Sequence, residues 1–503
     1  MSRTIPPLDL MWLLLETANS PTHVGGLMLF DRPPRAAPTF VADLVARYRA
    51  AKPRAPFNEV PELVGAALPH WRKPATVDLE YHVQHLALPP GATEATFLRL
   101  VEDLHEPMLD RNRPLFRVWL IEGLPDGRFA MYFKAHHSII DGVSATARIA
   151  ASMSESARER LRPPMFAVEV SPSRPRHPQG LVEQVSAFNR SAMRQTSALK
   201  DVSVGLVVKT LRRLLGKDDA GSQPFTAPHL ATNEPVRTPR SFAMLSLPLE
   251  AMRTAGHAFG GTINDVAATI VDAGLQGYLA GIDRPAKQRL VTMLPVSLRD
   301  EGDLSAKTLA SAMFVALGKP NAGVVDRMQQ VMASIEVGKT ELRGMSKDAA
   351  MLYAVSVLGI GTATEMSNAV GRLTGHVANF VLSNVPGSRN DLYLGGARLA
   401  AIYPISALAL NVGVNVTMVS HAGTMYFGFV ANAAALPDIE EAARHTEAAF
   451  AQLQAAAKRR PARRAAKKPG AKKPAAKKTR ATKPAATRRA PAGARRRAGE
   501  AAA

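Results

Sequence analysis

The sequence predicts a protein of mixed α and β structure, with two domains and a basic C-terminal tail. Its 503 residues exceed what one ordinary core accommodates, and 46% hydrophobic with 21% charged residues are typical of a globular protein. Strand-like and helix-like patterns occur in both halves of the chain. We expect an N-terminal domain over residues 1–160, a linker over 161–240, a second domain over 241–457 and a tail over 458–503.

The formal net charge of +21 belongs almost entirely to the tail. From Lys458 onward there are eighteen Lys and Arg residues and one acid, Glu500, whereas the preceding 457 residues carry 45 basic and 41 acidic side chains. The tail repeats Ala, Pro, Lys and Arg and has no aromatic or branched aliphatic residue that could form a core. We expect it to be disordered and to bind anionic lipid or nucleic acid non-specifically.

The sequence lacks cysteine and shows no sign of a signal peptide or of a transmembrane helix. The chain has no cysteine, which excludes disulfides, thiolate zinc sites and a cysteine nucleophile. The apolar stretch at 10–15 is bracketed by Asp9 and Glu16 and is followed by no small-residue cleavage site, so we expect no signal peptide. The longest apolar stretch, 349–362, is shorter than the roughly 20 residues that span a bilayer, so we expect no transmembrane helix.

The clearest local unit of the first domain is a β-hairpin. Residues 116–122 and 129–134 are strand-like, and the Pro-Asp-Gly sequence at 125–127 has the conformational preferences of a turn. Two adjacent histidines follow the second strand. Residues 143–153 are rich in small residues and predict a helix, with Asp141 near its N-terminus.

The region between the domains differs in composition from its neighbours. Five prolines lie between positions 163 and 178, and a helical pattern follows over 181–215. We interpret this region as a connection that contains its own helix. Within it, residues 205–217 combine apolar and basic side chains, which is compatible with an anionic membrane interface and with a helix that packs between domains.

The second domain contains a further hairpin and a terminal helix. Residues 411–417 alternate nearly strictly, and a turn at 421–423 joins them to a strand over 424–430. Pro437 and Asp438 open an amphipathic helix. One face of that helix consists of Ile439, Ala442, Ala443, Thr446, Phe450 and Leu453.

The most informative segment is the HHxxxDG pattern of His136, His137, Asp141 and Gly142. A neutral imidazole, with an ordinary pKa of about 6.5, is well suited to remove a proton from a hydroxyl. His137 and Asp141 share a face if the segment turns helically, which would allow the carboxylate to orient the ring or its loop. Gly142 would permit a backbone bend that a larger residue resists.

Two simpler interpretations of the pattern stay open at this point. Adjacent histidines are more often a surface pair or hydrogen-bonded core groups than a catalytic site. His and Asp at this spacing can also bind a metal ion on a helix. No further cluster of His or carboxylate residues at ligand spacing completes such a site in the sequence, so we expect no metal.

Segments around the pattern carry a family resemblance. In order along the chain they are residues 7–9 with Glu16, 22–30, 71 with 78–83, 113–116, 136–142, 264–265, 294–299 and 383–387. Together they resemble the bacterial wax ester synthase and acyl-CoA:diacylglycerol acyltransferase family of the HHxxxDG acyltransferase superfamily. Phe116 stands where the family's PLW motif has Trp, residues 56–61 match its arginine-bearing block poorly, and the basic tail lies outside the pattern.

The resemblance implies a fold and a reaction. The fold would be two chloramphenicol-acetyltransferase-like domains of mixed α/β structure with a central channel between them. The reaction would transfer a fatty acyl group from acyl-CoA, a co-substrate, to diacylglycerol or a long-chain alcohol, giving triacylglycerol or wax ester. His137 would be the general base that activates the hydroxyl, with no acyl-enzyme and no cofactor.

The resemblance also assigns supporting roles. His136 would shape the cleft, and Asp141 would form a structural ion pair for which Arg299 is the candidate. Asn384 would line the opposite wall and support the oxyanion, or it would form a turn.

Two further expectations concern location and rival functions. Because the acceptors reside in bilayers, we expect a cytoplasmic protein in peripheral contact with the inner membrane face or with lipid inclusions. The rival functions are an acyltransferase of the same superfamily that acts on a polyketide or glycolipid hydroxyl, and a non-catalytic lipid-binding or nucleoid-associated protein. The intact His137 argues against the second.

Overall fold

A computed structural model describes most of the chain. The described residues are 3–63, 68–159, 161–169, 224–298, 310–346, 349–350, 353–354, 356–357, 375–408 and 411–460. The expected linker helix over 181–215, the amphipathic segment over 205–217, the ion-pair candidate Arg299 and the tail from residue 461 lie outside these ranges.

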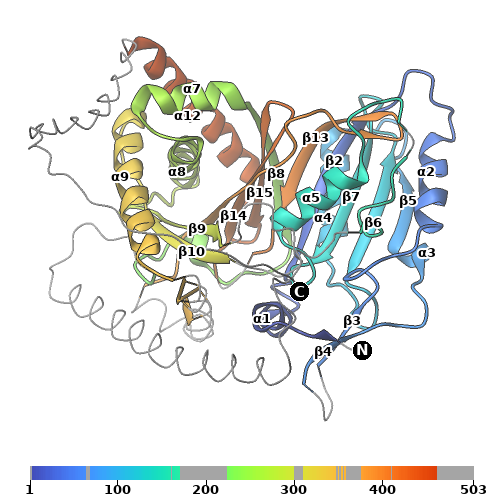
Figure 1. Ribbon diagram of the computed structural model, residues 1–503. Coiled ribbons are helices and arrows are strands. Elements are labelled where there is room, and N and C mark those ends of the chain that lie inside the picture. Colours follow the sequence, from blue (N-terminus) through green and yellow to red (C-terminus); the bar gives the residue numbers. More distant parts are fainter. Residues whose placement is uncertain are drawn as a thin grey trace, which may run out of the picture. The chain divides into compact units, whose positions relative to one another are not determined.

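One six-stranded sheet, here called the N-terminal sheet, carries the HHxxxDG pattern (Figure 1). Its strands, in sheet order, are β12 (Tyr393–Leu394), β13 (Ala397–Ile405), β2 (His23–Asp31), β7 (Phe129–His136), β6 (Phe116–Glu122) and β5 (Val83–Ala87). The helices of this half are α1 (Pro7–Leu15), α2 (Phe40–Arg49), α3 (Leu79–His82), α4 (Glu94–His105) and α5 (Gly142–Ser152). A small sheet of β1 (Arg3–Thr4), β4 (His70–Arg72) and β3 (Val60–Glu62) adjoins α1 in sequence.

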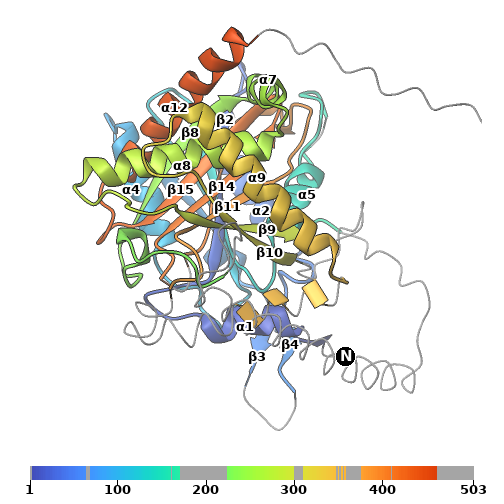
Figure 2. The ribbon, with the colours of Figure 1, turned by 90° about the vertical axis from the view of Figure 1, so that its left-hand side faces the viewer.

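A second six-stranded sheet, here called the C-terminal sheet, has its helices on one face (Figure 2). Its strands, in sheet order, are β10 (Ala310–Ala316), β9 (Val291–Ser297), β11 (Phe380–Val385), β14 (Val414–His421), β15 (Thr424–Asn432) and β8 (Arg240–Pro248). The helices are α7 (Leu249–Phe259), α8 (Ile263–Gly281), α9 (Val324–Arg343) and α12 (Ile439–Arg459), and a 3-10 turn, η1 (Ala231–Asn233), precedes β8. Both halves therefore have the mixed α/β structure that the sequence predicts.

Strand β13 joins the two halves of the chain. It comes from the C-terminal half, yet it pairs antiparallel with β2 at the centre of the N-terminal sheet. At one end of this pairing Arg398 Nη2 lies 2.6 Å from Asp31 Oδ2. No local sequence pattern predicted that a strand of the C-terminal half would join the N-terminal sheet. The domain boundaries at residues 160, 240 and 457 stay a prediction.

Both predicted hairpins are confirmed. β6 and β7 pair antiparallel, and Gly127 in their turn has a φ of +76°, a conformation that glycine adopts without strain. β14 and β15 pair through a turn in which Gly423 has a φ of +83°. The terminal helix is also confirmed, since its predicted apolar face is buried, namely Ile439, Ala442, Ala443, Thr446, Phe450 and Leu453.

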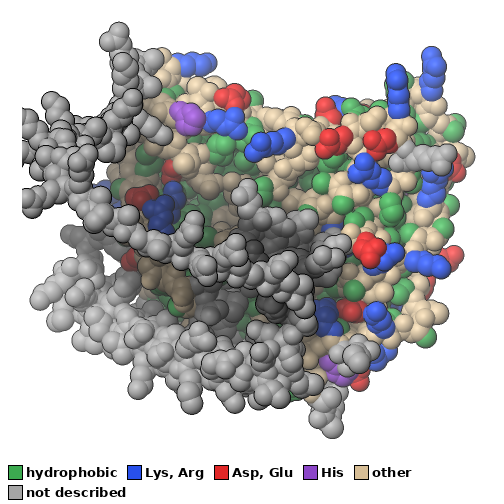
Figure 3. All heavy atoms as spheres, viewed as in Figure 1, with side chains coloured by type: hydrophobic (Ala, Val, Ile, Leu, Met, Phe, Trp, Pro, Cys, Tyr) green, Lys and Arg blue, Asp and Glu red, His purple; other side chains and the backbone are tan. Residues whose placement is uncertain are grey.

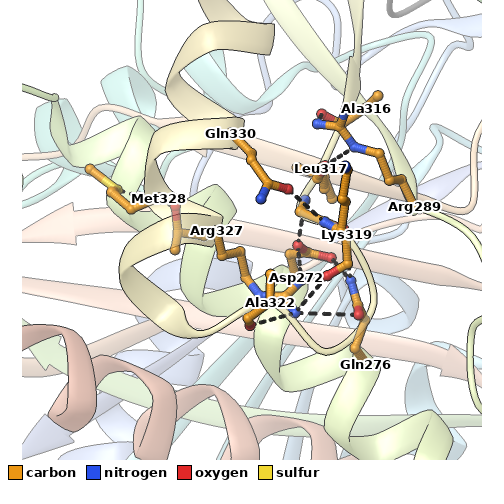
Figure 4. Close-up of polar contacts among 12 residues, drawn as sticks. Asp272, Gln276, Arg289, Ala316, Leu317, Lys319, Ala322, Arg327, Met328 and Gln330 are labelled. Atoms are coloured by element: carbon orange, nitrogen blue, oxygen red, sulfur yellow. Dashed lines mark hydrogen bonds and ion pairs between the residues drawn. The ribbon is translucent and has the colours of Figure 1, made fainter. Parts of the chain in front are cut away.

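A buried ion pair fixes α9 to α8 (Figure 4). The Asp272 carboxylate on α8 accepts hydrogen bonds from the Arg327 guanidinium, from the Gly318 backbone N–H (2.9 Å) and from the Gln276 amide (2.7 Å). Burial raises the pKa of Asp272, and the Arg327 cation opposes that rise. Because both charged groups are buried, removing either one would leave the other without compensation.

Two surface features follow from composition. On the face that Figure 3 shows, basic and acidic side chains are interspersed over the described residues, in keeping with the near balance of charge before the tail. Among the described residues, no helix combines the length and the apolar character that a membrane span requires.

Candidate active site

The two histidines of the pattern lie where β7 leaves the N-terminal sheet. The His136 backbone N–H donates to the Leu115 carbonyl (3.0 Å), and the His137 N–H donates to the Thr22 carbonyl (2.9 Å). Leu115 and Thr22 immediately precede β6 and β2, the two strands that pair with β7. Both neighbouring strands of β7 therefore fix the backbone of the histidines. This explains why a strand end, rather than a loop, presents the pattern.

The His136 ring is fully buried, and both its nitrogens are engaged. Nδ1 accepts a hydrogen bond from the Ser138 N–H (3.1 Å), so Nε2 carries the ring proton of the neutral form. Nε2 lies 2.9 Å from Thr22 Oγ1, whose own hydroxyl donates to the Trp12 carbonyl (3.0 Å). Because both ring nitrogens have hydrogen-bond partners, His136 is suited to fix the local structure and not to exchange protons with a substrate.

Glu16 is the anionic anchor of this network, and its side chain is fully buried. Its carboxylate lies 3.5 Å from His136 Nε2 and 3.0 Å from Arg111 Nη2, and it accepts the Thr22 N–H at 3.1 Å. Burial raises the pKa of Glu16, but the hydrogen bonds that its carboxylate accepts from His136, Thr22 and Arg111 outweigh burial and leave that pKa below its ordinary value. The carboxylate is thus ionised at neutral pH.

His137 has a different environment from its neighbour. Its ring stacks on the indole of Trp12, with ring centroids 4.4 Å apart and an interplanar angle of 18°. Nδ1 is buried and makes no hydrogen bond to another described residue; the one backbone hydrogen bond of the ring is to His137 itself, and the residue as a whole is partly exposed. Burial lowers the pKa of His137, and the negative charge of Asp141 partly opposes this shift. The ring is therefore neutral at pH 7, which is the state a general base requires.

Asp141 caps helix α5, the helix that the sequence predicts after the pattern. Its carboxylate accepts hydrogen bonds from the Ser144 N–H (2.9 Å) and the Ser144 hydroxyl (2.7 Å), while the Ser144 hydroxyl oxygen also accepts from the Asp141 N–H (3.1 Å). This reciprocal arrangement is a capping box. The ion pair with Arg299 stays a prediction, because Arg299 lies outside the described residues.

Gly142 has a steric role that the sequence analysis misjudged. The expectation was a backbone bend that only glycine tolerates, but Gly142 is the first residue of α5 and does not have a positive φ. A Cβ at this position would lie 2.7 Å from Val385 Cγ2 on β11. Glycine is therefore needed for the close approach of α5 to the C-terminal sheet.

Asn384 lies beside this contact, in strand β11, so its interpretation as a turn residue is wrong. Its side-chain amide donates to Asn264 Oδ1 at 2.6 Å. Asn264 belongs to the first turn of α8, where Thr262 and Asp265 form a capping box. The pair of amides therefore joins β11 to the N-terminus of α8 next to the HHxxxDG pattern.

Sequence reasoning missed the residues that support the histidines. Trp12, Glu16, Thr22 and Arg111 are distant from the pattern in the chain. Glu16 and Thr22 lie in segments that carry the family resemblance, but the resemblance assigned them no role at the site, and Trp12 and Arg111 lie outside those segments. The described residues contain no group of three or more His, Cys, Asp or Glu side chains that could hold a metal ion.

Comparison with known proteins identifies the family. The wax ester synthase/diacylglycerol acyltransferase catalytic domain matches residues 5–267, and the C-terminal domain of the same family matches residues 309–454. A Mycobacterium tuberculosis protein named as a diacylglycerol O-acyltransferase is 32% identical over 494 residues, which cover 90% of this chain and 98% of that protein. The O-acyltransferase WSD of Acinetobacter baylyi is 31% identical, over 88% of this chain and 95% of that protein.

Solved structures agree with this assignment. The wax ester synthase/diacylglycerol acyltransferase from Marinobacter aquaeolei VT8 superimposes with a TM-score of 0.69 at 27% identity, over 90% of this chain and all of that one. A condensation domain of the calcium-dependent antibiotic synthetase shares the fold alone, with a TM-score of 0.55 at 14% identity over 92% of this chain and 97% of that one. The expected two-domain mixed α/β fold is confirmed, and the chain belongs to the wax ester synthase/diacylglycerol acyltransferase family of acyltransferases.

Proposed function

We propose that this protein transfers a fatty acyl group from acyl-CoA to the hydroxyl of diacylglycerol or of a long-chain alcohol, with His137 as the general base. The names of its relatives supply both kinds of acceptor. One observation carries the assignment of the base: of the two adjacent histidines, only His137 is partly exposed, whereas His136 is fully buried, and burial together with its neighbours lowers the pKa of His137.

The reaction follows from the position of the His137 ring. Nδ1 is buried, which leaves Nε2 as the nitrogen that can reach a bound hydroxyl. Nε2 accepts the hydroxyl proton as the alcohol oxygen attacks the thioester carbon. The tetrahedral oxyanion then collapses, the carbon–sulfur bond breaks, and the sulfur of coenzyme A takes the proton from His137 as it leaves. The acyl group passes directly to the alcohol, so no acyl-enzyme forms.

The neighbours of His137 act as positioning residues in this scheme. Trp12 packs against the ring face and restricts its rotation. Glu16 and Thr22 hold His136, which precedes His137 on the strand. Asp141 fixes the start of α5 and adds a negative charge that stabilises the imidazolium formed during the reaction. We retain Arg299 as the proposed ion-pair partner of Asp141 and Asn384 as the candidate support for the oxyanion.

Peripheral contact with a lipid surface is part of the proposal. Leu14 on α1 is 66% exposed and Leu68 beside β4 is 76% exposed, so both present a large apolar side chain to the surroundings. The two segments adjoin, because the Ile5 N–H before α1 donates to the Pro69 carbonyl (3.0 Å). Helix α1 also carries Trp12, so lipid contact at this surface would bring the acceptor near His137.

The decisive assay uses the full chain with palmitoyl-CoA and a panel of acceptors. Diacylglycerol, hexadecanol and a glycolipid alcohol are compared by coenzyme A release and by ester product. We expect ester formation with diacylglycerol or hexadecanol. Turnover confined to the glycolipid alcohol would assign the protein to a different acceptor class, and a lack of turnover with every acceptor would favour a non-catalytic lipid-binding role.

A further inference from the structure

The C-terminal half contains a cavity that the proposed reaction does not yet explain. It has a volume of about 420 Å³ and lies between the C-terminal sheet and helix α9. Its floor consists of the buried side chains of Met313, Ile335, Leu382 and Met418, which come from β10, α9, β11 and β14. A buried floor of flexible and branched apolar side chains suits an alkyl chain and offers no hydrogen bonds to a polar ligand.

A short series of contacts links the wall of the cavity to the candidate active site. Asn264 lines the cavity and accepts the hydrogen bond from Asn384. The next residue of β11, Val385, packs against Gly142, the last residue of the HHxxxDG pattern. Adjacent residues of β11 therefore connect the cavity wall to the HHxxxDG pattern, which makes the cavity a candidate site for the chain of a substrate that reacts at His137.

Two basic residues, here called the rim of the cavity, distinguish between the acyl donor and the alcohol acceptor. Lys339 and Arg343 on α9 are the basic residues that line the cavity, and Glu336, which pairs with Arg343 at 3.4 Å, does not line it. Their aliphatic stems extend the apolar wall, while their cationic groups attract an anion. Diacylglycerol and fatty alcohols are neutral, whereas acyl-CoA carries phosphates. The rim therefore favours the acyl donor over the acceptor.

We propose that this cavity holds the fatty acyl chain of the acyl-CoA donor and sets the chain length that the enzyme accepts, with Lys339 attracting the anionic donor. The inference rests on the proposed function and assigns one of its two substrates to a specific part of the fold. The buried Asp272–Arg327 pair maintains the cavity, because it fixes α9 against α8 (Figure 4).

The first test fills the cavity. Ile335→Phe on α9 and Leu382→Phe on β11 each add an aromatic ring to the floor, so they shorten the space for a chain from two different elements. Val337→Phe is the matched control, since Val337 lies on the same helix, is 38% exposed and does not line the cavity. The readout is kcat/KM for palmitoyl-CoA divided by kcat/KM for butyryl-CoA, with hexadecanol as the acceptor.

We expect this ratio to fall about tenfold or more in each filled variant and to stay unchanged in the control. Two outcomes would overturn the inference: an unchanged ratio in folded filled variants, or a changed preference for alcohol length with the acyl preference intact. The proposed function fails separately, if the wild-type protein releases coenzyme A from neither donor.

The second test concerns the rim. Lys339→Met keeps the aliphatic stem and removes the charge, and Lys287→Met removes a charge from an exposed site elsewhere in the same half. We expect Lys339→Met to raise KM for palmitoyl-CoA several-fold at low salt, with kcat and the KM for hexadecanol unchanged. Equal effects of the two substitutions would show that overall charge, and not Lys339 itself, attracts the donor.

Discussion

The two six-stranded sheets of this acyltransferase support its site in different ways. The N-terminal sheet holds His136 and His137 through a network of buried polar contacts to Glu16 and Thr22, in which donors and acceptors are matched. The C-terminal sheet instead presents apolar side chains to a cavity below α9. Proton transfer needs a ring fixed in one orientation, whereas selection of an alkyl chain needs a shaped space. On the two proposals above, one half supplies the chemistry and the other sets the chain-length preference.

The largest expected effect is on the chemical half. His137→Ala removes the proposed base, and we expect kcat for coenzyme A release to fall by about 10²- to 10⁴-fold. The thermal melting temperature should fall less than in His136→Ala, because His137 loses its stacking on Trp12 but no hydrogen bond to another described residue. His136→Ala serves as the contrasting variant: its satisfied buried ring predicts a loss of stability along with any loss of activity.

The next effect concerns the half that holds the cavity. Asp272→Asn leaves Arg327 buried without a countercharge, and we expect the free energy of unfolding to fall by about 3–5 kcal/mol. Chemical denaturation measures this loss. A fall of less than about 1 kcal/mol would indicate that the pair does not hold α9 in place. Surface variants such as Arg253→Ala, whose partner Glu250 is exposed, should change stability by less than that amount.

A smaller effect tests the contact between the halves. Gly142→Ala places a methyl group 2.7 Å from Val385 Cγ2, and overpacking of this kind destabilises by about 1–3 kcal/mol. Val385→Ala removes the clashing atoms, so the double variant should recover most of the stability that Gly142→Ala loses. A double-mutant cycle that shows additive effects would contradict this contact.

The smallest effect separates two roles of Asp141. Asp141→Ala removes the cap of α5 and should destabilise by about 1 kcal/mol, whereas Asp141→Asn keeps a capping side chain and should cost only a few tenths. Asp141→Asn also removes the charge that raises the pKa of His137. The acidic limb of its pH–rate profile should therefore lie at lower pH than that of the wild type. A limb that does not move would limit Asp141 to capping.

Features coded by neighbouring residues were predictable from the sequence. The turn at Gly127, the alternation of β14 and the apolar face of α12 each arise within a short window, because turn chemistry and periodicity are local properties. The helix after the HHxxxDG pattern was predictable for the same reason. Its cap by Asp141 agrees with the expected position at the helix N-terminus.

Contacts between distant segments were not predictable in this way. Glu16 and His136 are 120 residues apart in the chain, as are Asn264 and Asn384, and no short window contains either pair. The insertion of β13 beside β2 likewise depends on tertiary pairing. The role of Gly142 was misjudged because the sequence does not reveal that Val385 lies against it.

The pH dependence of kcat/KM for coenzyme A release by the wild-type protein shows directly whether His137 acts as the general base. His137 is active when neutral, and burial places its pKa below the ordinary value of 6.5. The rate should therefore fall as the pH drops through a pKa that lies below 6.5, and this limb should be absent from the residual activity of His137→Ala. A limb centred above pH 6.5, or one that persists in His137→Ala, would contradict the assignment of His137 as the general base.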